Sequence, residues 1–219
     1  FERYPRDEER DLAVAEQAGT DIVFLPQVAE MYPQPIKTMV SVREVTTRLC
    51  GASRPGHFDG VATVVAKLFH IVQPDAAFFG MKDAQQVAVI EQMVLDLNLP
   101  VEIVPCPTIR EADGLAKSSR NVYLNEEERK QATVLSAALR EAETALAESG
   151  VGLTPQQLIE NVRTHIRRSP LAEIDYAEVL AFPSLEPLES FTQGERIIVA
   201  LAVKFGKTRL IDNCIVRIP

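Results

Sequence analysis

The chain of 219 residues is poor in cysteine, in long apolar runs and in positive charge. Its cysteines, Cys50, Cys106 and Cys214, are widely separated and form no CxxC pair, which argues against a zinc site or a disulfide framework and predicts a reducing, cytoplasmic location. No apolar run approaches the roughly 18 residues of a membrane span, and the charged start FERYPRDEERD is unlike a signal peptide. A formal net charge of -8 argues against binding duplex nucleic acid by phosphate neutralisation. We therefore expect neither a membrane nor a nucleic-acid partner.

The stretch DAAFFGMKDAQQVAVIEQ, residues 75–92, joins a predicted strand to a predicted helix. Residues 76–79 form an apolar run of strand type, and over 82–97 the apolar positions recur at helical spacing. Gly80 lies at the junction. A strand that turns straight into a helix directs unpaired backbone N–H groups and the positive end of the helix dipole outward, an arrangement that favours phosphate.

The polar residues of this junction suit the same ligand. Lys82 adds a mobile positive charge, and Asp83 and Gln86 lie three residues apart, so that a helix presents both from one face. A polar first turn of an ordinary helix would use the same residues. Strand-glycine-helix junctions are frequent in α/β proteins, so this stretch alone leaves both interpretations open.

The loop CGASRPGHFDG, residues 50–60, presents Arg54 and His57 just before a helix predicted over 61–72. A guanidinium beside a helix N-terminus suits a phosphate or a carboxylate. His57 taken alone is also consistent with a structural role or with plain exposure.

A second polar loop, READGLAKSSRNVYL, covers residues 110–124 and has two charges and two hydroxyls on successive residues. Such a set could wrap a triphosphate, with hydroxyl and backbone donors on its oxygens and cationic ends on the developing charge. A solvated loop with a serine cap is the alternative. The four residues are Lys117, Ser118, Ser119 and Arg120.

The order of predicted elements favours a parallel sheet in the first half of the chain. Helix-length connections between short apolar strands imply right-handed crossovers, and ligands on such sheets lie beyond the carboxyl ends of the strands. That edge receives residues 80–83 and 105–110. The predicted strands are 21–25, 38–42, 76–79 and 101–105, and the predicted helices are 7–18, 26–31, 61–72 and 82–97.

The second half has a different pattern, with helices followed by adjacent strands, which predicts a small α+β domain with an antiparallel sheet. We place the boundary near 109–113 and expect two domains, 1–109 and 110–219. The loop carrying Lys117 would then lie at their interface, a usual place for a closing active site. The predicted helices are 125–147 and 156–168, and the predicted strands are 175–182, 196–205 and 208–216.

Five motifs in this order resemble the pantothenate synthetase family, the pantoate–β-alanine ligases, and together they span nearly the whole chain. They are RYPR (3–6), RPGHFDG (54–60), FFGMKDAQQ (78–86), READGLAKSSRN (110–121) and RLIDN (209–213). The resemblance implies an α/β fold with a Rossmann-like nucleotidyltransferase domain of the HIGH/KMSKS type, N-terminally incomplete here, plus the small C-terminal domain. It also implies a cytoplasmic homodimer that uses ATP and Mg²⁺ to form pantoyl adenylate. Attack by β-alanine then gives pantothenate, AMP and pyrophosphate.

The resemblance also implies roles for individual residues. Lys82 would hold phosphates, Gly80 and Asp83 would contact the ribose, and Gln86 would bind pantoate. The nucleotide-binding residues would be Gly80, Met81, Lys82, Asp83 and Ile109, the last through its backbone to adenine, together with the KMSKS-like loop Lys117, Ser118, Ser119 and Arg120. Of these, the catalytic residues would be Lys82, Ser118, Ser119 and Arg120. Arg54 and His57 would border the substrate site, and the metal ligands stay open. This fits an adenylation, which needs positioning and charge stabilisation more than a covalent nucleophile.

The sequence departs from the family pattern in two respects. Met81 stands where the family usually has glutamate, which we expect to be tolerated if the backbone makes the contact. The HxGH segment of the family, with the proton-donating histidine, is expected before residue 1, so activity of these 219 residues alone stays open. The alternatives are a nucleotidyltransferase acting on another small acid, and a non-catalytic nucleotide-binding or dimerising fragment.

Overall fold

The structure is a computed structural model that describes residues 7–219, so the motif RYPR at 3–6 lies outside the described residues. The chain divides into two compact units, Phe1–Met39 and Val40–Pro219, which are considered separately below.

The first unit contains two helices, α1 (Glu8–Gln17) and α2 (Val28–Met31). Asp7 caps α1, accepting a hydrogen bond from the Arg10 backbone N–H at 3.1 Å. The strand predicted over 21–25 is wrong: this segment has no regular structure, and Ile22 is 85% exposed. An apolar run becomes a strand only when a neighbour accepts its backbone hydrogen bonds, and no described segment pairs with it.

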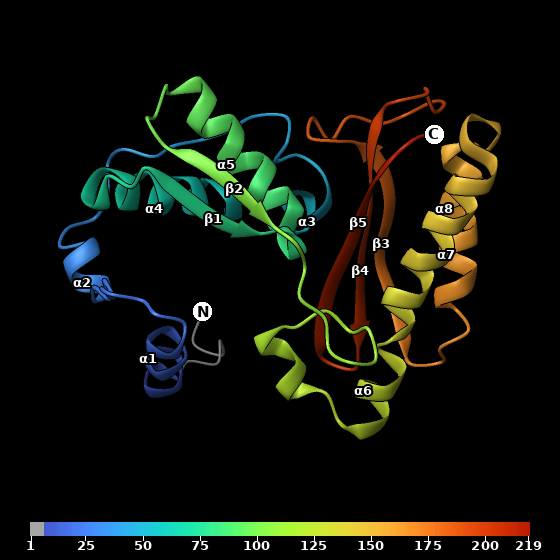
Figure 1. Cartoon of the computed structure of the whole chain (residues 1–219), viewed down its shortest axis with the longest axis horizontal. Coiled ribbons are helices and arrows are strands. Elements are labelled where there is room, and N and C mark those ends of the chain that lie inside the picture. Colours follow the sequence, from blue (N-terminus) through green and yellow to red (C-terminus); the bar gives the residue numbers. More distant parts are fainter. Residues whose placement is uncertain (1–6) are drawn as a thin grey trace. The chain divides into compact units, whose positions relative to one another are not determined.

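The second unit begins with a helical layer beside a small parallel sheet. Strands β1 (Ala76–Gly80) and β2 (Glu102–Cys106) pair in parallel, with Ala76 opposite Glu102 and Gly80 opposite Cys106. The predicted parallel crossover is therefore confirmed for these two strands. Figure 1 shows them beside the helices of this layer. These are α3 (Leu49–Ser53), α4 (His57–Val72) and α5 (Ala84–Asp96).

Three local predictions need correction here. Residues 38–42 do not form a strand, because the Val40 N–H donates to the Thr63 hydroxyl of α4 at 3.0 Å instead of to a neighbouring strand. Helix α5 starts two residues later than predicted, after a single 3₁₀ turn, η1 (Met81–Asp83), because the Asp83 carboxylate caps its first turn. Helix α4 starts earlier than predicted, at His57, and α3 was not predicted.

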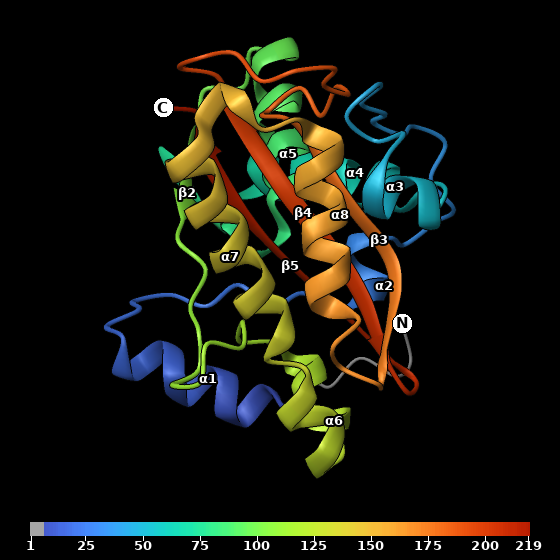
Figure 2. The ribbon, with the colours of Figure 1, turned by 90° about the vertical axis from the view of Figure 1, so that its right-hand side faces the viewer.

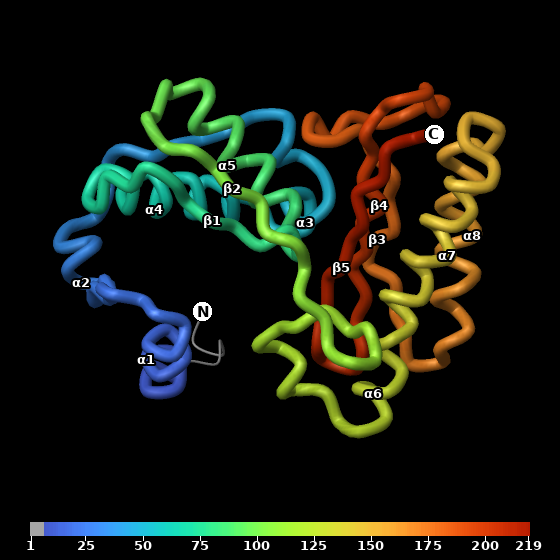
Figure 3. Tube along the Cα trace, viewed as in Figure 1, coloured from blue at the N-terminus to red at the C-terminus, as the bar shows by residue number. Residues whose placement is uncertain are grey.

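The rest of the unit is a helical pair on an antiparallel sheet of strand order β3-β4-β5. The helix predicted over 125–147 is broken near Thr133, whose hydroxyl donates to the Lys130 carbonyl at 2.8 Å and so competes with the helical ladder. The chain trace leaves β2 and passes beside β5 before it reaches α6 (Figure 3). The elements are η2 (Ser119–Tyr123), α6 (Glu126–Gln131), α7 (Val134–Ser149), η3 (Gly150–Gly152), α8 (Pro155–Ile166), β3 (Ala172–Ala181), β4 (Arg196–Phe205) and β5 (Thr208–Arg217).

Both faces of the antiparallel sheet are covered. Alternate residues of β4 such as Val199 and Leu201 pack with α7 and α8, which lie across the sheet in Figure 2. The intervening residues Ile198 and Ala200 pack with the buried side chains of α4 and α5. This explains why β4 is apolar almost throughout, since side chains alternate between faces and both faces are buried. The structure thus combines a parallel pair with helices and a three-stranded antiparallel sheet, as the predicted α/β and α+β parts require.

Candidate active site

The junction after β1 is open toward solvent. Gly80 has φ -72°, which any residue adopts, and a Cβ added there would contact no atom within 4 Å. Glycine is therefore not required by the backbone, and its missing side chain leaves space above the turn for a ligand to approach. The Asp83 carboxylate accepts from the Gln86 N–H at 3.3 Å and so fixes the start of α5.

The turn itself is held from below by the last strand. The Asn213 side-chain amide on β5 donates to the carbonyl oxygens of Met81 at 2.9 Å and Lys82 at 3.1 Å. Asn213 is only 9% exposed. A buried amide that satisfies two carbonyls keeps the turn in one conformation and leaves the Lys82 side chain to reach outward.

Lys82 lies in a field made by several charged residues. Burial lowers the pKa of its ammonium, nearby Asp83 and Asp212 raise it, and Arg120 lowers it. The structure shows no ion pair of Lys82 with any described residue. A partly desolvated cation of this kind interacts strongly with an arriving anion.

Arg54 and His57 meet at the start of α4. Arg54 Nη1 lies 3.0 Å from His57 Nε2, and because a guanidinium can only donate, His57 accepts there and carries its proton on Nδ1 when neutral. Burial lowers the His57 pKa, and Arg54 and Arg120 lower it further against the opposite effect of Asp83. The same two cations therefore favour a neutral imidazole at this edge of the site.

The second polar loop is anchored where it leaves β2. The Arg110 guanidinium makes two hydrogen bonds to the Asp212 carboxylate, at 2.7 and 3.0 Å, and a third to the Gly114 carbonyl at 3.1 Å. Asp212 is 2% exposed. A buried carboxylate held by a bidentate guanidinium is a rigid anchor. Lys117 closes the turn with its N–H on the Ile109 carbonyl at 2.9 Å.

The residues of the KMSKS-like loop have different surroundings. Ser118 caps η2 through an acceptor bond from the Arg120 N–H at 3.3 Å, and Lys117 forms an exposed ion pair with Glu111 at 4.0 Å. Ser119 and the Ile109 side chain are exposed. Arg120 is the member of the loop whose charge acts on both Lys82 and His57. The charge of Arg120 therefore reaches Lys82 in the turn after β1, while the Lys117 side chain pairs within its own loop.

The two adjacent glutamines of α5 have separate roles. Gln85 is 4% exposed; its amide donates to the carbonyls of Val45 at 2.9 Å and Arg48 at 2.8 Å, and its oxygen accepts from the Cys50 N–H at 3.0 Å. Gln86 is partly exposed and its side chain has no hydrogen bond to a described residue. Gln85 thus fastens the loop that leads to α3, and Gln86 is the one available to a ligand.

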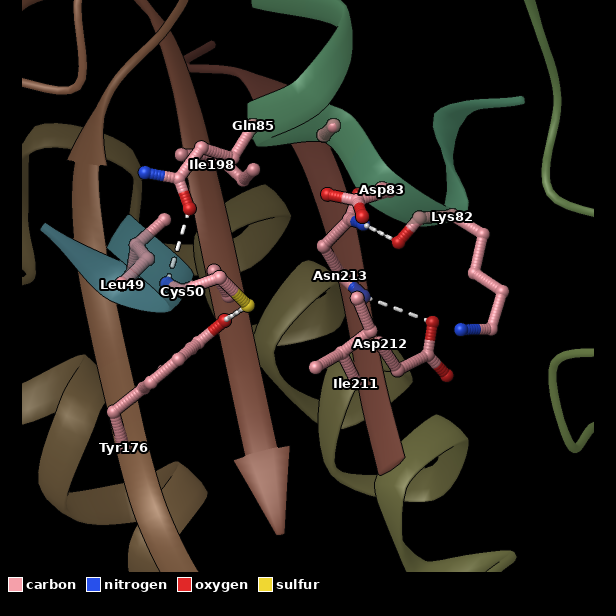
Figure 4. A pocket seen from close by; sticks show the side chains of 12 residues that line it. Leu49, Cys50, Lys82, Asp83, Gln85, Tyr176, Ile198, Ile211, Asp212 and Asn213 are labelled. Atoms are coloured by element: carbon pink, nitrogen blue, oxygen red, sulfur yellow. Dashed lines mark hydrogen bonds between the residues drawn. The ribbon is translucent and has the colours of Figure 1, made fainter. Parts of the chain in front are cut away.

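A small cavity of about 20 Å³ lies below this surface (Figure 4). Lys82 and Asp83 lie on one wall, and Cys50 and Tyr176 on another, with the Cys50 thiol 3.3 Å from the Tyr176 hydroxyl. Burial and the adjacent Cys50 raise the Tyr176 pKa, so the phenol stays neutral. The volume accommodates about one water molecule, so this cavity is too small for a substrate.

The sequence analysis missed the inner residues of the site, Asp212 and Asn213 above all. They belong to the motif RLIDN, to which we assigned no role. A charged residue fully buried in an apolar strand is uncommon unless it is paired, so the position of Asp212 between Ile211 and a second polar residue was the available signal.

Neither a metal cage nor a membrane span is evident in residues 7–219. No group of three or more histidine, cysteine, aspartate or glutamate side chains gathers there in a way that could hold a metal ion. None of the helices described is both long and apolar enough to cross a bilayer.

Comparison with known sequences identifies the family. The sequence model of the family described as pantoate-beta-alanine ligase matches residues 1–215. The pantothenate synthetase of Geobacillus thermodenitrificans is 55% identical over 219 residues, all of this chain and 74% of the relative. That of Acetivibrio thermocellus is 56% identical and is covered to 76% of its length.

Solved structures give the same result. A pantothenate synthetase from Thermus thermophilus superimposes with a TM-score of 0.90 at 46% identity, over 97% of this chain and 75% of that one. A pantoate-beta-alanine ligase from Francisella tularensis, complexed with beta-gamma ATP and beta-alanine, gives a TM-score of 0.73 at 30% identity, over 96% of this chain and 70% of that one. This chain belongs to the pantoate-beta-alanine ligase family.

Proposed function

We propose that the protein joins pantoate to β-alanine with ATP, through an enzyme-bound pantoyl adenylate, and releases pantothenate, AMP and pyrophosphate. Membership of the family supports this reaction, as do its relatives named pantothenate synthetase and the Francisella ligase complexed with beta-gamma ATP and β-alanine. The observation that carries it in this chain is that Lys82, beside the open turn at Gly80, lies within reach of the positive charge of Arg120 on a separate loop.

The first half-reaction needs charge stabilisation. A carboxylate oxygen of pantoate attacks the α-phosphorus of ATP, a P–O bond forms, and the bond to the β-phosphate oxygen breaks, so pyrophosphate leaves with its added negative charge. We assign Lys82 and Arg120 to that charge, with Ser118 and Ser119 as hydroxyl donors. Mg²⁺, which would be held largely by the phosphates of ATP and by water, would supply further positive charge to the leaving pyrophosphate.

Substrate placement follows from the same surface. We assign the open space above Gly80, with Asp83, to the ribose, the backbone of Ile109 to adenine, and Gln86 to pantoate, bordered by Arg54 and His57. In the second half-reaction the β-alanine amine attacks the acyl carbon, the amide bond forms, and AMP leaves as the amine loses a proton. The pantoyl adenylate reacts with the amine and is not hydrolysed only while water is excluded from this surface.

Several finer features stay proposals. They are the Rossmann-like nucleotidyltransferase fold of the HIGH/KMSKS type, the domain boundary at 109–110 with a closing C-terminal domain, the homodimer and the cytoplasmic location. The two-strand parallel sheet with ligand residues at the carboxyl end of β1 supports the fold assignment.

The function is tested by product analysis on the protein in its full encoded length. AMP and pantothenate should form in equal amounts from ATP, pantoate and β-alanine, and turnover should cease when either acid is omitted. Equal kcat/KM with another small hydroxy acid would instead favour the nucleotidyltransferase of different specificity. ATP binding without turnover by these 219 residues would favour the non-catalytic alternative.

A further inference from the structure

Strand β5 contacts two segments of the site through adjacent residues: the turn after β1 and the second polar loop, residues 110–124. Asn213 donates to the carbonyls of Met81 and Lys82, and Asp212 accepts the two hydrogen bonds of Arg110. These two anchors connect segments that are separated by nearly thirty positions in the sequence.

The two anchors point to opposite faces of the sheet. Leu210 and Cys214 pack with the apolar cluster under α7 and α8, whereas Ile211 and Ile215 pack with the cluster on the other face. Because side chains alternate along a strand, Asp212 belongs to the first face and Asn213 to the second. β5 is the last strand in the order β3-β4-β5, and segments outside the sheet contact both of its faces, Arg110 through Asp212 and the turn after β1 through Asn213.

The anchors are also coupled to each other. The Asp212 carboxylate accepts a hydrogen bond from the Asn213 backbone N–H at 2.8 Å as well as the guanidinium. Replacing Asp212 therefore removes the acceptor of the Asn213 N–H as well as the partner of Arg110, and because the two residues are adjacent, one stiff peptide unit joins the two anchors.

We propose that Asp212 and Asn213 act together as a positioning pair that sets the distance between Lys82 and Arg120 for transfer of the adenylyl group. This rests on the proposed function. Neither side chain touches the reacting atoms: Asn213 acts through the backbone of Lys82, and Asp212 acts through Arg110 and the turn that leads to Arg120. A pair of phosphate-binding charges works only at the correct separation, and misplacement by about 1 Å can cost on the order of a hundredfold in rate.

The test uses Asn213→Ala, Asp212→Asn and the double variant, with Ile215→Val as the matched control on the same strand. Hydrogen exchange followed by mass spectrometry reads the placement of each loop without any turnover. Asn213→Ala should speed exchange mainly in residues 80–86, and Asp212→Asn mainly in residues 110–121. The control should leave both segments unchanged. Unchanged exchange in the anchored segments would overturn the proposal.

Kinetics then separates positioning from simple destabilisation. In pantoate-dependent exchange of pyrophosphate into ATP, each single variant should lower kcat/KM for ATP at least about tenfold, with KM for β-alanine in the full reaction within about twofold. The double variant should lose less than the product of the two single losses, since the second anchor matters little once the spacing is lost.

Two kinetic results would overturn the pair. One is a fully multiplicative loss in the double variant, and the other is an equal loss in Ile215→Val. If the wild type exchanges no pyrophosphate into ATP, the proposed function fails. Hydrogen exchange in residues 80–86 and 110–121 then still decides whether the anchors hold these segments.

Discussion

Replacing Gln85 by leucine should destabilise the protein strongly while sparing the catalytic surface. Three backbone groups, the carbonyls of Val45 and Arg48 and the N–H of Cys50, lose their partners in an interior where Gln85 is 4% exposed. A buried hydrogen bond contributes about 1 kcal/mol net, so the free energy of unfolding should fall by about 3 kcal/mol. For a chain of this length that lowers the melting temperature by roughly 6–12 °C.

The neighbouring glutamine is the matched control. Gln86→Leu removes no hydrogen bond to a described residue, so its unfolding free energy should change by less than about 0.5 kcal/mol. Its KM for pantoate should rise at least about tenfold if Gln86 binds that substrate. Urea unfolding, thermal unfolding and steady-state kinetics of both variants make the comparison. A melting temperature of Gln85→Leu within about 2 °C of the wild type would refute the reasoning, as would equal destabilisation by both variants.

Three further changes have defined outcomes. Lys82→Ala should slow adenylate formation about a hundredfold or more in single-turnover assays, and an unchanged rate would remove Lys82 from the site. Because the His57 pKa is lowered from 6.5, the unfolded chain binds more protons than the folded chain just below pH 6.5, so the free energy of unfolding rises with pH there. His57→Asn should lose part of that rise when urea unfolding is measured at several pH values. The same dependence of the unfolding free energy on pH in both proteins would contradict this prediction. Gly114→Ala should cost about 1–2 kcal/mol in thermal unfolding, since Gly114 has φ +94° and a Cβ would lie 2.9 Å from Arg140 Nη1 and Ser136 Oγ; full stability would show that the turn relaxes.

Hydrophobic periodicity predicted those elements whose partners are close in the sequence. The strand-turn-helix-strand unit from β1 to β2 and the three C-terminal strands were found with boundary errors of a few residues. Residues 21–25 have the same apolar composition as a buried strand, but the pattern contains no information on whether a second strand lies beside them. The break at Thr133 was missed because a side-chain hydroxyl that bonds to its own helix does not disturb the apolar spacing.

The outer residues of the candidate site carry a clearer sequence signal than the inner ones. Glycine, lysine and arginine in polar loops after strands indicate anion binding, and the structure brings Lys82 and Arg120 together. Helix α5 is buried on most sides, so periodicity could not separate the structural Gln85 from the available Gln86. The pairing of Asp212 with Arg110 joins residues about a hundred positions apart, and such a contact follows only from the tertiary fold.

The most direct measurement of the central claim is the exchange of labelled pyrophosphate into ATP by the full-length protein, with and without pantoate and with and without β-alanine. An adenylate intermediate predicts exchange that requires pantoate and proceeds without β-alanine, because the first half-reaction is complete and reversible before the amine enters. Exchange that requires β-alanine, or production of ADP and phosphate in place of AMP and pyrophosphate, would contradict the account.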